Sequence, residues 1–167
     1  GCTSEQRLAM VNAAVLPEPA LRADAREIAS DKPSYTLLTL QGLREALGEH
    51  HPICMVMGMD AYLTLPKWHQ WQDFLGYAHI IVVARPGYHF EPDEIMQRYT
   101  CANRVTDKAE LLSKPAGHVL IHEMTPLGIS ATQVRQLVTR GDSPRYLLPD
   151  SVWAYIKDHN LYGYLTN

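Results

Sequence analysis

The sequence is poor in the features that mark several large classes of protein. Its three cysteines, Cys2, Cys54 and Cys101, are scattered and odd in number, which argues against a disulfide framework and favours a reducing cytoplasm. No apolar run approaches the length of a bilayer span, and no signal peptide is visible. Fifteen basic and eighteen acidic residues give a net charge of -3, whereas general nucleic-acid binding needs a basic surplus. We therefore expect neither a membrane protein nor a nucleic-acid-binding protein.

Common short signatures of catalysis and nucleotide binding are also missing. The sequence contains no P-loop, no G-x-G-x-x-G and no G-x-S-x-G. His118 and His122 share one face of a predicted strand, but no cysteine or carboxylate completes a metal set beside them. We therefore expect no resident metal site.

The composition is that of a folded globular protein, with 46% hydrophobic and 20% charged residues. We expect one domain over residues 1–167, long enough to bury about two-thirds of the unfolded chain's surface. Apolar runs at residues 53–57, 78–84 and 118–123 predict three strands, the first with Cys54 as a core thiol. Such runs with helices between them predict an α/β fold, a parallel sheet with helices on both faces and ligands at the carboxyl ends of the strands.

The helical signals are of two kinds, caps and periodic apolar positions. Thr3 and Gln6 form a capping-box pattern that opens a helix to Val15. Leucines at helical spacing predict a further helix from residues 34–36 to Gly48. Weaker patterns favour helices at residues 91–99, 130–140 and 149–159, a short strand at 21–25, and a surface excursion at 100–116.

Two groups of residues are candidates for binding a nucleotide. Ser130, Thr132 and Arg135 open a helix after a strand, where free N–H groups, a hydroxyl and a guanidinium suit a polyphosphate. An ordinary capped helix with a surface arginine explains the same pattern. Gly58 and Asp60 follow a strand, where a carboxylate can accept hydrogen bonds from a ribose, although Asp60 could equally cap the next helix.

Two further segments complete the candidate site. Arg85 follows the strand at residues 78–84 and is expected at the same sheet edge as Asp60, or else it is a solvated turn residue. Trp68 and His69, together with Tyr35 and Thr36, suit a flat heterocycle that is stacked on one face and hydrogen-bonded at its edge. The alternative is that the tryptophans are core residues, and for Trp71 we expect that.

In order along the chain, these segments resemble one family, the bacterial nicotinate mononucleotide adenylyltransferases. The resemblance runs from residue 4 to about residue 162 and is loosest at residues 89–117. The segments that carry it are Gln6–Met10, Asp31–Thr36, Gly58–Ala61, Leu65–His69, Ala78–Tyr88, Ile129–Arg135, Tyr146–Val152 and His159–Tyr162. No single segment is decisive, but the ordered set is specific.

The resemblance implies a Rossmann-like nucleotidyltransferase fold and an enzyme of NAD biosynthesis in the cytoplasm. The reaction it implies is AMP transfer from ATP to nicotinate mononucleotide, with Mg²⁺ assisting, to give deamido-NAD and pyrophosphate. Position by position, Ser130, Thr132 and Arg135 would hold the ATP phosphates. Gly58 and Asp60 would hold the ribose, with Arg85 beside the adenosine. Trp68 would stack on the pyridine ring, Tyr35 would shape its pocket, and N–H groups of Thr36 and His69 would bind the nicotinate carboxylate.

The sequence departs from the family at its start. The family opens with a strand, a glycine-rich turn and a catalytic H-x-G-H motif, and none of the eight histidines lies in such a motif. The resemblance and the initial Gly1 therefore predict that several tens of residues, including a sheet strand, precede this chain. Without them we expect little catalysis. The alternatives are a non-catalytic nucleotide-binding fragment, or an adenylyltransferase for nicotinamide mononucleotide or pantetheine phosphate.

Overall fold

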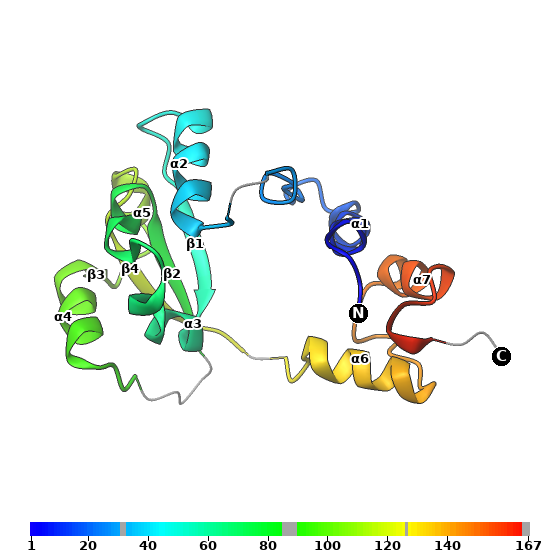
Figure 1. The fold of residues 1–167 in the computed structure, drawn as a ribbon. Helices are drawn as coiled ribbons and strands as arrows, with labels where there is room; N and C mark the ends of the chain where they lie inside the picture. Colours follow the sequence, from blue (N-terminus) through cyan, green and yellow to red (C-terminus); the bar gives the residue numbers. More distant parts are fainter. Residues whose placement is uncertain (31–32, 85–89, 126, 165–167) are drawn as a thin grey trace. The chain divides into compact units, whose positions relative to one another are not determined.

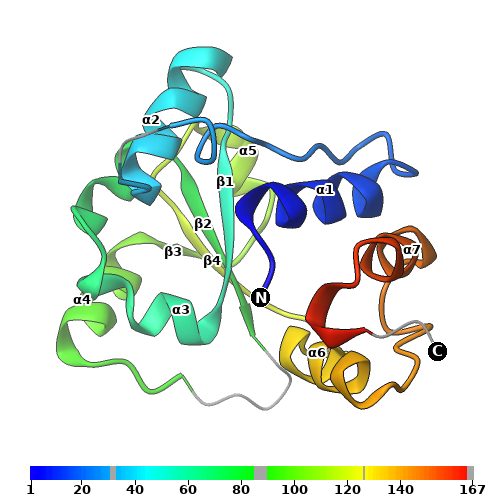
Figure 2. The same cartoon turned by 45° about the vertical axis from the view of Figure 1, so that its right-hand side comes forward.

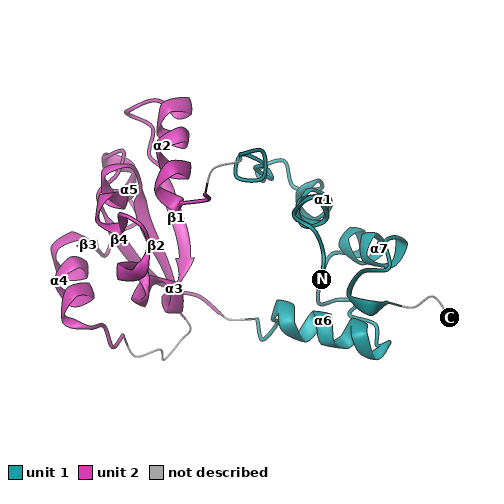
Figure 3. Ribbon diagram, in the orientation of Figure 1, with its two compact units in different colours: residues 1–32, 127–167 teal, residues 33–126 magenta. Residues whose placement is uncertain are grey.

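The computed structural model describes residues 1–30, 33–84, 90–125 and 127–164. The chain divides into two compact units (Figure 3). Unit 1 combines residues 1–32 with 127–167, and unit 2 consists of residues 33–126. A single domain over residues 1–167 remains a prediction.

Unit 2 is built on a four-stranded parallel sheet (Figure 1). Its strands are β1 (Cys54–Gly58), β2 (His79–Ala84), β3 (Arg104–Val105) and β4 (Val119–Glu123). They lie in the order β1-β2-β4-β3, and the two views agree that β1, β2 and β4 run side by side (Figures 1 and 2). Gly58 pairs with Val83, so β1 and β2 end at the same edge. The predicted parallel sheet is confirmed.

Helices cover both faces of this sheet, as the α/β pattern predicts. Unit 2 contains α2 (Thr36–Leu47), α3 (Met59–Leu63), α4 (Glu94–Asn103) and α5 (Glu110–Ser113), with 3-10 turns η1 (Leu65–Lys67) and η2 (Trp71–Gly76). On one face, alternate strand residues such as Ile80 and Val82 pack with α2, α3 and α4. On the other, Ile81 and Leu120 pack with Leu111 of α5. The alternation follows from the two-residue period of a strand.

The first strand departs from the expected burial. Met55 and Met57 face the core, but Cys54 is exposed and the Val56 side chain is 63% exposed. β1 has one neighbour in the sheet, and the helix on this second face packs against β2 and β4. The prediction of an apolar strand buried on both faces, with Cys54 as a core thiol, is therefore wrong.

A single arginine joins the loops at the amino-terminal end of the sheet. The Arg44 guanidinium, in the last turn of α2, donates to the carbonyls of Gly48 (3.0 Å), Glu49 (3.3 Å) and His51 (2.5 Å). Its other terminal nitrogen donates to the carbonyls of Tyr77 (2.6 Å) and Pro115 (2.8 Å). These carbonyls belong to the segments that lead into β1, β2 and β4, so one cation joins the three segments, and the Pro115 carbonyl also accepts the Ile53 N–H at 3.2 Å.

His79, at the start of β2, is fully buried next to these loops. Its Nδ1 accepts the His118 backbone N–H at 3.0 Å, so Nε2 carries the ring proton and donates to the Lys114 carbonyl at 2.9 Å. The ring also stacks on His118, with centroids 5.3 Å apart. Burial lowers the pKa of His79, and His118 and Arg44 lower it further, against the raising effect of the Lys114 carbonyl. The folded protein therefore holds this imidazole neutral.

Unit 1 is helical. It contains α1 (Ser4–Val15), α6 (Ala131–Arg140), α7 (Asp150–Asp158) and the 3-10 turn η3 (Leu161–Gly163). The capping box between Thr3 and Gln6 forms as predicted, and Ser151 on α7 donates to the Ala13 carbonyl of α1 at 2.8 Å. No helix among the described residues combines the length and apolarity that a bilayer span requires.

Two local predictions are wrong. Residues 21–25 form no strand, because Glu18 and Asp24 instead fold the chain by accepting hydrogen bonds from nearby backbone N–H groups. The region at 100–116 is not an unpatterned excursion, since it contains β3 and α5. The helix expected at 91–99 begins later, at Glu94, because the Asp93 side chain caps it by accepting from the Met96 N–H at 2.8 Å.

We predict that His79 makes stability depend on pH. Its pKa is lower in the folded chain than the ordinary 6.5, so the unfolded chain binds more protons below that pH. The contribution of neutral His79 to the free energy of unfolding is therefore fully present above about pH 6.5. It is lost as the pH falls toward the pKa of His79 in the folded chain. His79→Gln keeps one acceptor and one donor but does not titrate, so its free energy of unfolding should change less between pH 7.5 and 5.5.

Urea unfolding of both proteins at the two pH values is the measurement. His159→Gln, at the end of α7, is the control, since it removes a histidine that is exposed. Equal pH dependence in the wild type and His79→Gln contradicts the prediction.

Candidate functional site

The first part of the candidate site is the amino-terminal end of α6 in unit 1. Ser130 is the N-cap, and its hydroxyl accepts the Gln133 N–H at 3.1 Å, so this helix is capped by its own side chain. The Arg135 guanidinium donates to the Thr132 hydroxyl at 3.2 Å. In the part of the chain that the structure describes, no carboxylate pairs with Arg135. These three predicted phosphate ligands therefore lie together, with the positive end of the helix dipole and an uncompensated cation.

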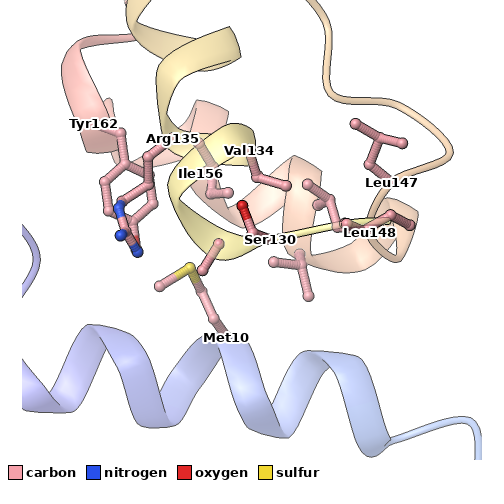
Figure 4. Close-up of a pocket in the computed structure, with 11 residues that line it drawn as sticks. Met10, Ser130, Val134, Arg135, Leu147, Leu148, Ile156 and Tyr162 are labelled. Carbon is pink, nitrogen blue, oxygen red and sulfur yellow. The ribbon is translucent and has the colours of Figure 1, made fainter. Parts of the chain in front are cut away.

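A cavity of about 270 Å³ lies beside this helix end (Figure 4). Ser130, Arg135 and Tyr162 supply its polar lining. The remaining lining residues are apolar and come from α1, α6, α7 and their connections: Met10, Ile129, Ala131, Val134, Leu147, Leu148, Val152 and Ile156. The apolar lining offers no hydrogen bonds to replace the water that a triphosphate would lose on entering the cavity. An anion would therefore bind at the polar rim near Ser130 and Arg135 rather than in the interior.

Tyr162 is held against α6 and was not among the predicted site residues. The Thr139 hydroxyl lies 2.9 Å from the Arg135 carbonyl and 3.0 Å from the Tyr162 carbonyl, and its proton is shared between them. The Tyr162 hydroxyl is 3.1 Å from the Cys2 thiol. Burial, and then Cys2, raises the pKa of Tyr162 to about 12, although Arg135 and Arg7 act in the opposite direction. The phenol therefore stays neutral near pH 7.

The second part lies at the carboxyl edge of the sheet in unit 2. Gly58 ends β1 and is the N-cap of α3, and Asp60 lies in the first turn of that helix. No side chain caps α3, so the reading of Asp60 as a helix cap is wrong, and its carboxylate is exposed. A Cβ added at Gly58 would meet no atom within 4 Å, so the fold itself does not require glycine there. Arg85, predicted for the same edge, lies outside the described residues.

The third part is an aromatic pocket of about 300 Å³, also in unit 2. We use this name for the cavity lined by Ser34, Tyr35, Thr36, Lys67, Trp68, His69 and Phe74. Tyr35 and His69 stack with ring centroids 4.3 Å apart, and Trp68 packs edge-on against Phe74 at 6.3 Å. The four residues predicted for a flat heterocycle are therefore gathered in one cavity. Trp71 is buried in the core, as predicted.

Backbone donors are available at this aromatic pocket. Thr36 is the first residue of α2, where a helix leaves its N–H groups without intrahelical acceptors, and the N-cap Tyr35 provides no side-chain cap. His69 lies between η1 and η2. Among the described residues, neither Thr36 nor His69 donates its N–H in a backbone turn or loop hydrogen bond. The pocket thus offers flat rings together with donors that suit a carboxylate oxygen.

Sequence reasoning missed two residues at these sites. Lys67 lines the aromatic pocket one position before Trp68, and that adjacency was the available signal. Tyr162 follows α7 in the chain and contacts Thr139 of α6, and nothing in the local sequence predicts that contact. In the described ranges, no group of three or more His, Cys, Asp or Glu side chains could hold a metal ion.

Comparison with known proteins assigns the family. Residues 2–137 match the family model described as cytidylyltransferase-like. The chain is 45% identical over 161 residues to a probable nicotinate-nucleotide adenylyltransferase of Aeromonas salmonicida, an alignment that covers 96% of this chain and 75% of the relative. It is 44% identical over 160 residues to the Pseudomonas entomophila protein of the same name, covering 96% and 73%.

Solved structures agree on the fold. A Plasmodium falciparum nicotinic acid mononucleotide adenylyltransferase complexed with NaAD superposes with a TM-score of 0.63 at 15% identity, over 98% of this chain and 76% of the other. A structure of the same Plasmodium enzyme complexed with APC gives 0.59 at 17% identity, over 97% and 77%. The chain therefore has a Rossmann-like nucleotidyltransferase fold. With the sequence identities above, the chain is a member of the nicotinate-nucleotide adenylyltransferase family.

Proposed function

We propose that this protein transfers AMP from ATP to nicotinate mononucleotide in NAD biosynthesis. A phosphate oxygen of nicotinate mononucleotide attacks the α-phosphorus of ATP in line, the bond to the β-phosphate breaks, and pyrophosphate leaves with the electron pair. The products are deamido-NAD and pyrophosphate. The observation that carries the proposal is the aromatic pocket with its backbone donors in a chain of this family.

The aromatic pocket suits the pyridine end of nicotinate mononucleotide. Trp68 would stack on the ring, and Tyr35, which stacks on His69, would shape the pocket. The Thr36 and His69 N–H groups would donate to the carboxylate. An amide in place of the carboxylate would turn its NH₂ toward these donors, so the same contacts disfavour nicotinamide mononucleotide.

The remaining predicted residues suit ATP. Ser130, Thr132 and Arg135 would bind phosphates at the end of α6, while Gly58 and Asp60 would hold the ribose and Arg85 would lie beside the adenosine. The adenylyl transfer requires a divalent metal, which we propose is Mg²⁺ brought in by the ATP phosphates rather than held by the chain. All these contacts are binding contacts, in keeping with a reaction catalysed by positioning and charge stabilisation.

The competing functions have less support. The relatives' names specify nicotinate nucleotide, which disfavours the amide and pantetheine phosphate alternatives. The proposed partners are the two small-molecule substrates, with no nucleic acid or membrane. We propose a cytoplasmic location, because the reaction consumes ATP.

Substrate choice is the first test of the proposed function. In the full-length protein we expect turnover with ATP and nicotinate mononucleotide, and a much lower kcat/KM with nicotinamide mononucleotide or pantetheine phosphate. Pyrophosphate release measured for each acceptor at equal ATP gives the comparison. Equal rates with the acid and the amide would remove the acid-specific assignment.

In the full-length protein, Arg135→Ala should weaken the use of ATP. A charge-assisted hydrogen bond to phosphate is worth about 1.5–3 kcal/mol, so kcat/KM for ATP should fall on the order of 10- to 100-fold. Arg140→Ala, in the last turn of the same helix and outside the cavity, is the matched control. Unchanged kinetics in Arg135→Ala would show that this helix end does not bind the phosphates.

Trp68→Ala should mainly affect the pyridine nucleotide. Stacking of a base on an aromatic ring is worth about 1–3 kcal/mol, so the KM for nicotinate mononucleotide should rise roughly 5- to 100-fold while that for ATP changes little. Trp68→Phe retains a flat ring and should recover most of the affinity. A variant that loses ATP and nicotinate mononucleotide equally would contradict a stacking role.

A further inference from the structure

The aromatic pocket contains a cation with no role in the contacts described so far. Lys67 is the one lysine or arginine among the seven residues that line it. We propose that Lys67 is a specificity-determining residue, which makes the pocket select a pyridine carboxylate over the uncharged carboxamide by charge. This inference rests on the proposed function, because it assigns the pocket to the pyridine end of the acceptor.

The backbone around Lys67 is held firmly. Lys67 ends the turn η1, where its N–H donates to the Thr64 carbonyl at 3.0 Å. The next N–H, of Trp68, donates to the Leu65 carbonyl at 2.9 Å, and the Leu65 side chain is fully buried. Pro66 fixes a further backbone dihedral in the same turn. The base of the lysine side chain is thus placed beside Trp68 by the core rather than by a loose loop.

The charge of Lys67 is available to a ligand. In the described part of the chain, the ion pairs are Arg26 with Asp24, Arg98 with Glu94, and Arg145 with Asp150, so Lys67 has no carboxylate partner there. The lining of the aromatic pocket contains no acidic side chain. A carboxylate ligand would therefore be the counter-ion that this wall lacks.

A charge is the property that best separates the two ligands. Nicotinate and nicotinamide have nearly the same shape, so an apolar wall or a stacked ring cannot tell them apart. Backbone N–H donors discriminate by hydrogen bonding, whereas a cation discriminates by net charge. Lys67 is exposed, so its contribution is screened by salt, whereas hydrogen bonds to fixed backbone groups are much less so. The two sources of selectivity are therefore separable by ionic strength.

Calorimetric titration of the protein with nicotinate mononucleotide and with nicotinamide mononucleotide, at low and at high salt, tests this role. In Lys67→Met we expect the affinity for the acid to fall roughly three- to tenfold at low salt, with the affinity for the amide unchanged. Lys67→Arg should retain the preference. Lys108→Met, which removes another exposed lysine of unit 2 that lines no described pocket, is the matched control and should behave as the wild type.

The outcomes separate the inference from the function it rests on. In the wild type the acid-to-amide affinity ratio should fall with salt, and in Lys67→Met it should be smaller and independent of salt. A wild-type ratio that salt leaves unchanged overturns the role of Lys67, and needs no variant to fold. An unchanged ratio in Lys67→Met, or an equal loss of both ligands, overturns it as well. A wild type that binds the amide as tightly as the acid overturns the proposed function itself.

Discussion

The Arg44 guanidinium holds together the end of the sheet at which its strands begin, opposite the edge that carries Gly58 and Asp60. Five carbonyl oxygens from the segments that enter β1, β2 and β4 converge on this one side chain. Loop carbonyls at the start of parallel strands have no ladder partner, and a forked cation can satisfy several at once. His79, kept neutral by burial, closes the same end through the Lys114 carbonyl and the His118 N–H.

With that end fixed, the parallel register determines which residues lie at the opposite edge of the sheet, where the strands end. Gly58 is paired with Val83, so the chain leaves β1 and β2 at one edge, and Asp60 follows within two residues. Arg44 also lies at the end of the helix whose first residues are Thr36 and Leu37. The carboxyl end of α2 therefore anchors the end of the sheet at which the strands begin. The amino end of α2 offers N–H groups to the aromatic pocket. The candidate residues of unit 2 are therefore carried by elements that pack into one core.

Features set by nearby residues could be predicted from the sequence. The capping box of α1, the Ser130 cap of α6 and the buried strand β2 depend on residues within a few positions, and each is confirmed. Features set by distant residues could not. The exposure of Val56 depends on where α5 packs, and β3 is a two-residue strand defined by its partner β4.

The candidate site shows the same division. Trp68 and His69 meet Tyr35 in one cavity because η1 and α2 pack together through the core, and the resemblance to a family was needed to expect that meeting. Asp60 could not be separated from a helix cap by spacing alone, and the structure decided the matter by showing Gly58 at the cap. The position of Lys67 in the pocket lining could not be predicted from its place beside Trp68, because a lysine next to an aromatic residue is common on protein surfaces.

The most direct test of the proposed adenylyl transfer site is a crystal structure of the protein with nicotinate mononucleotide bound. The pyridine ring should lie in the aromatic pocket against Trp68, with carboxylate oxygens within hydrogen-bond distance of the Thr36 and His69 nitrogens. A ring found elsewhere, or a carboxylate turned away from both nitrogens and toward solvent, would contradict the assignment of this pocket and the acid-specific function built on it.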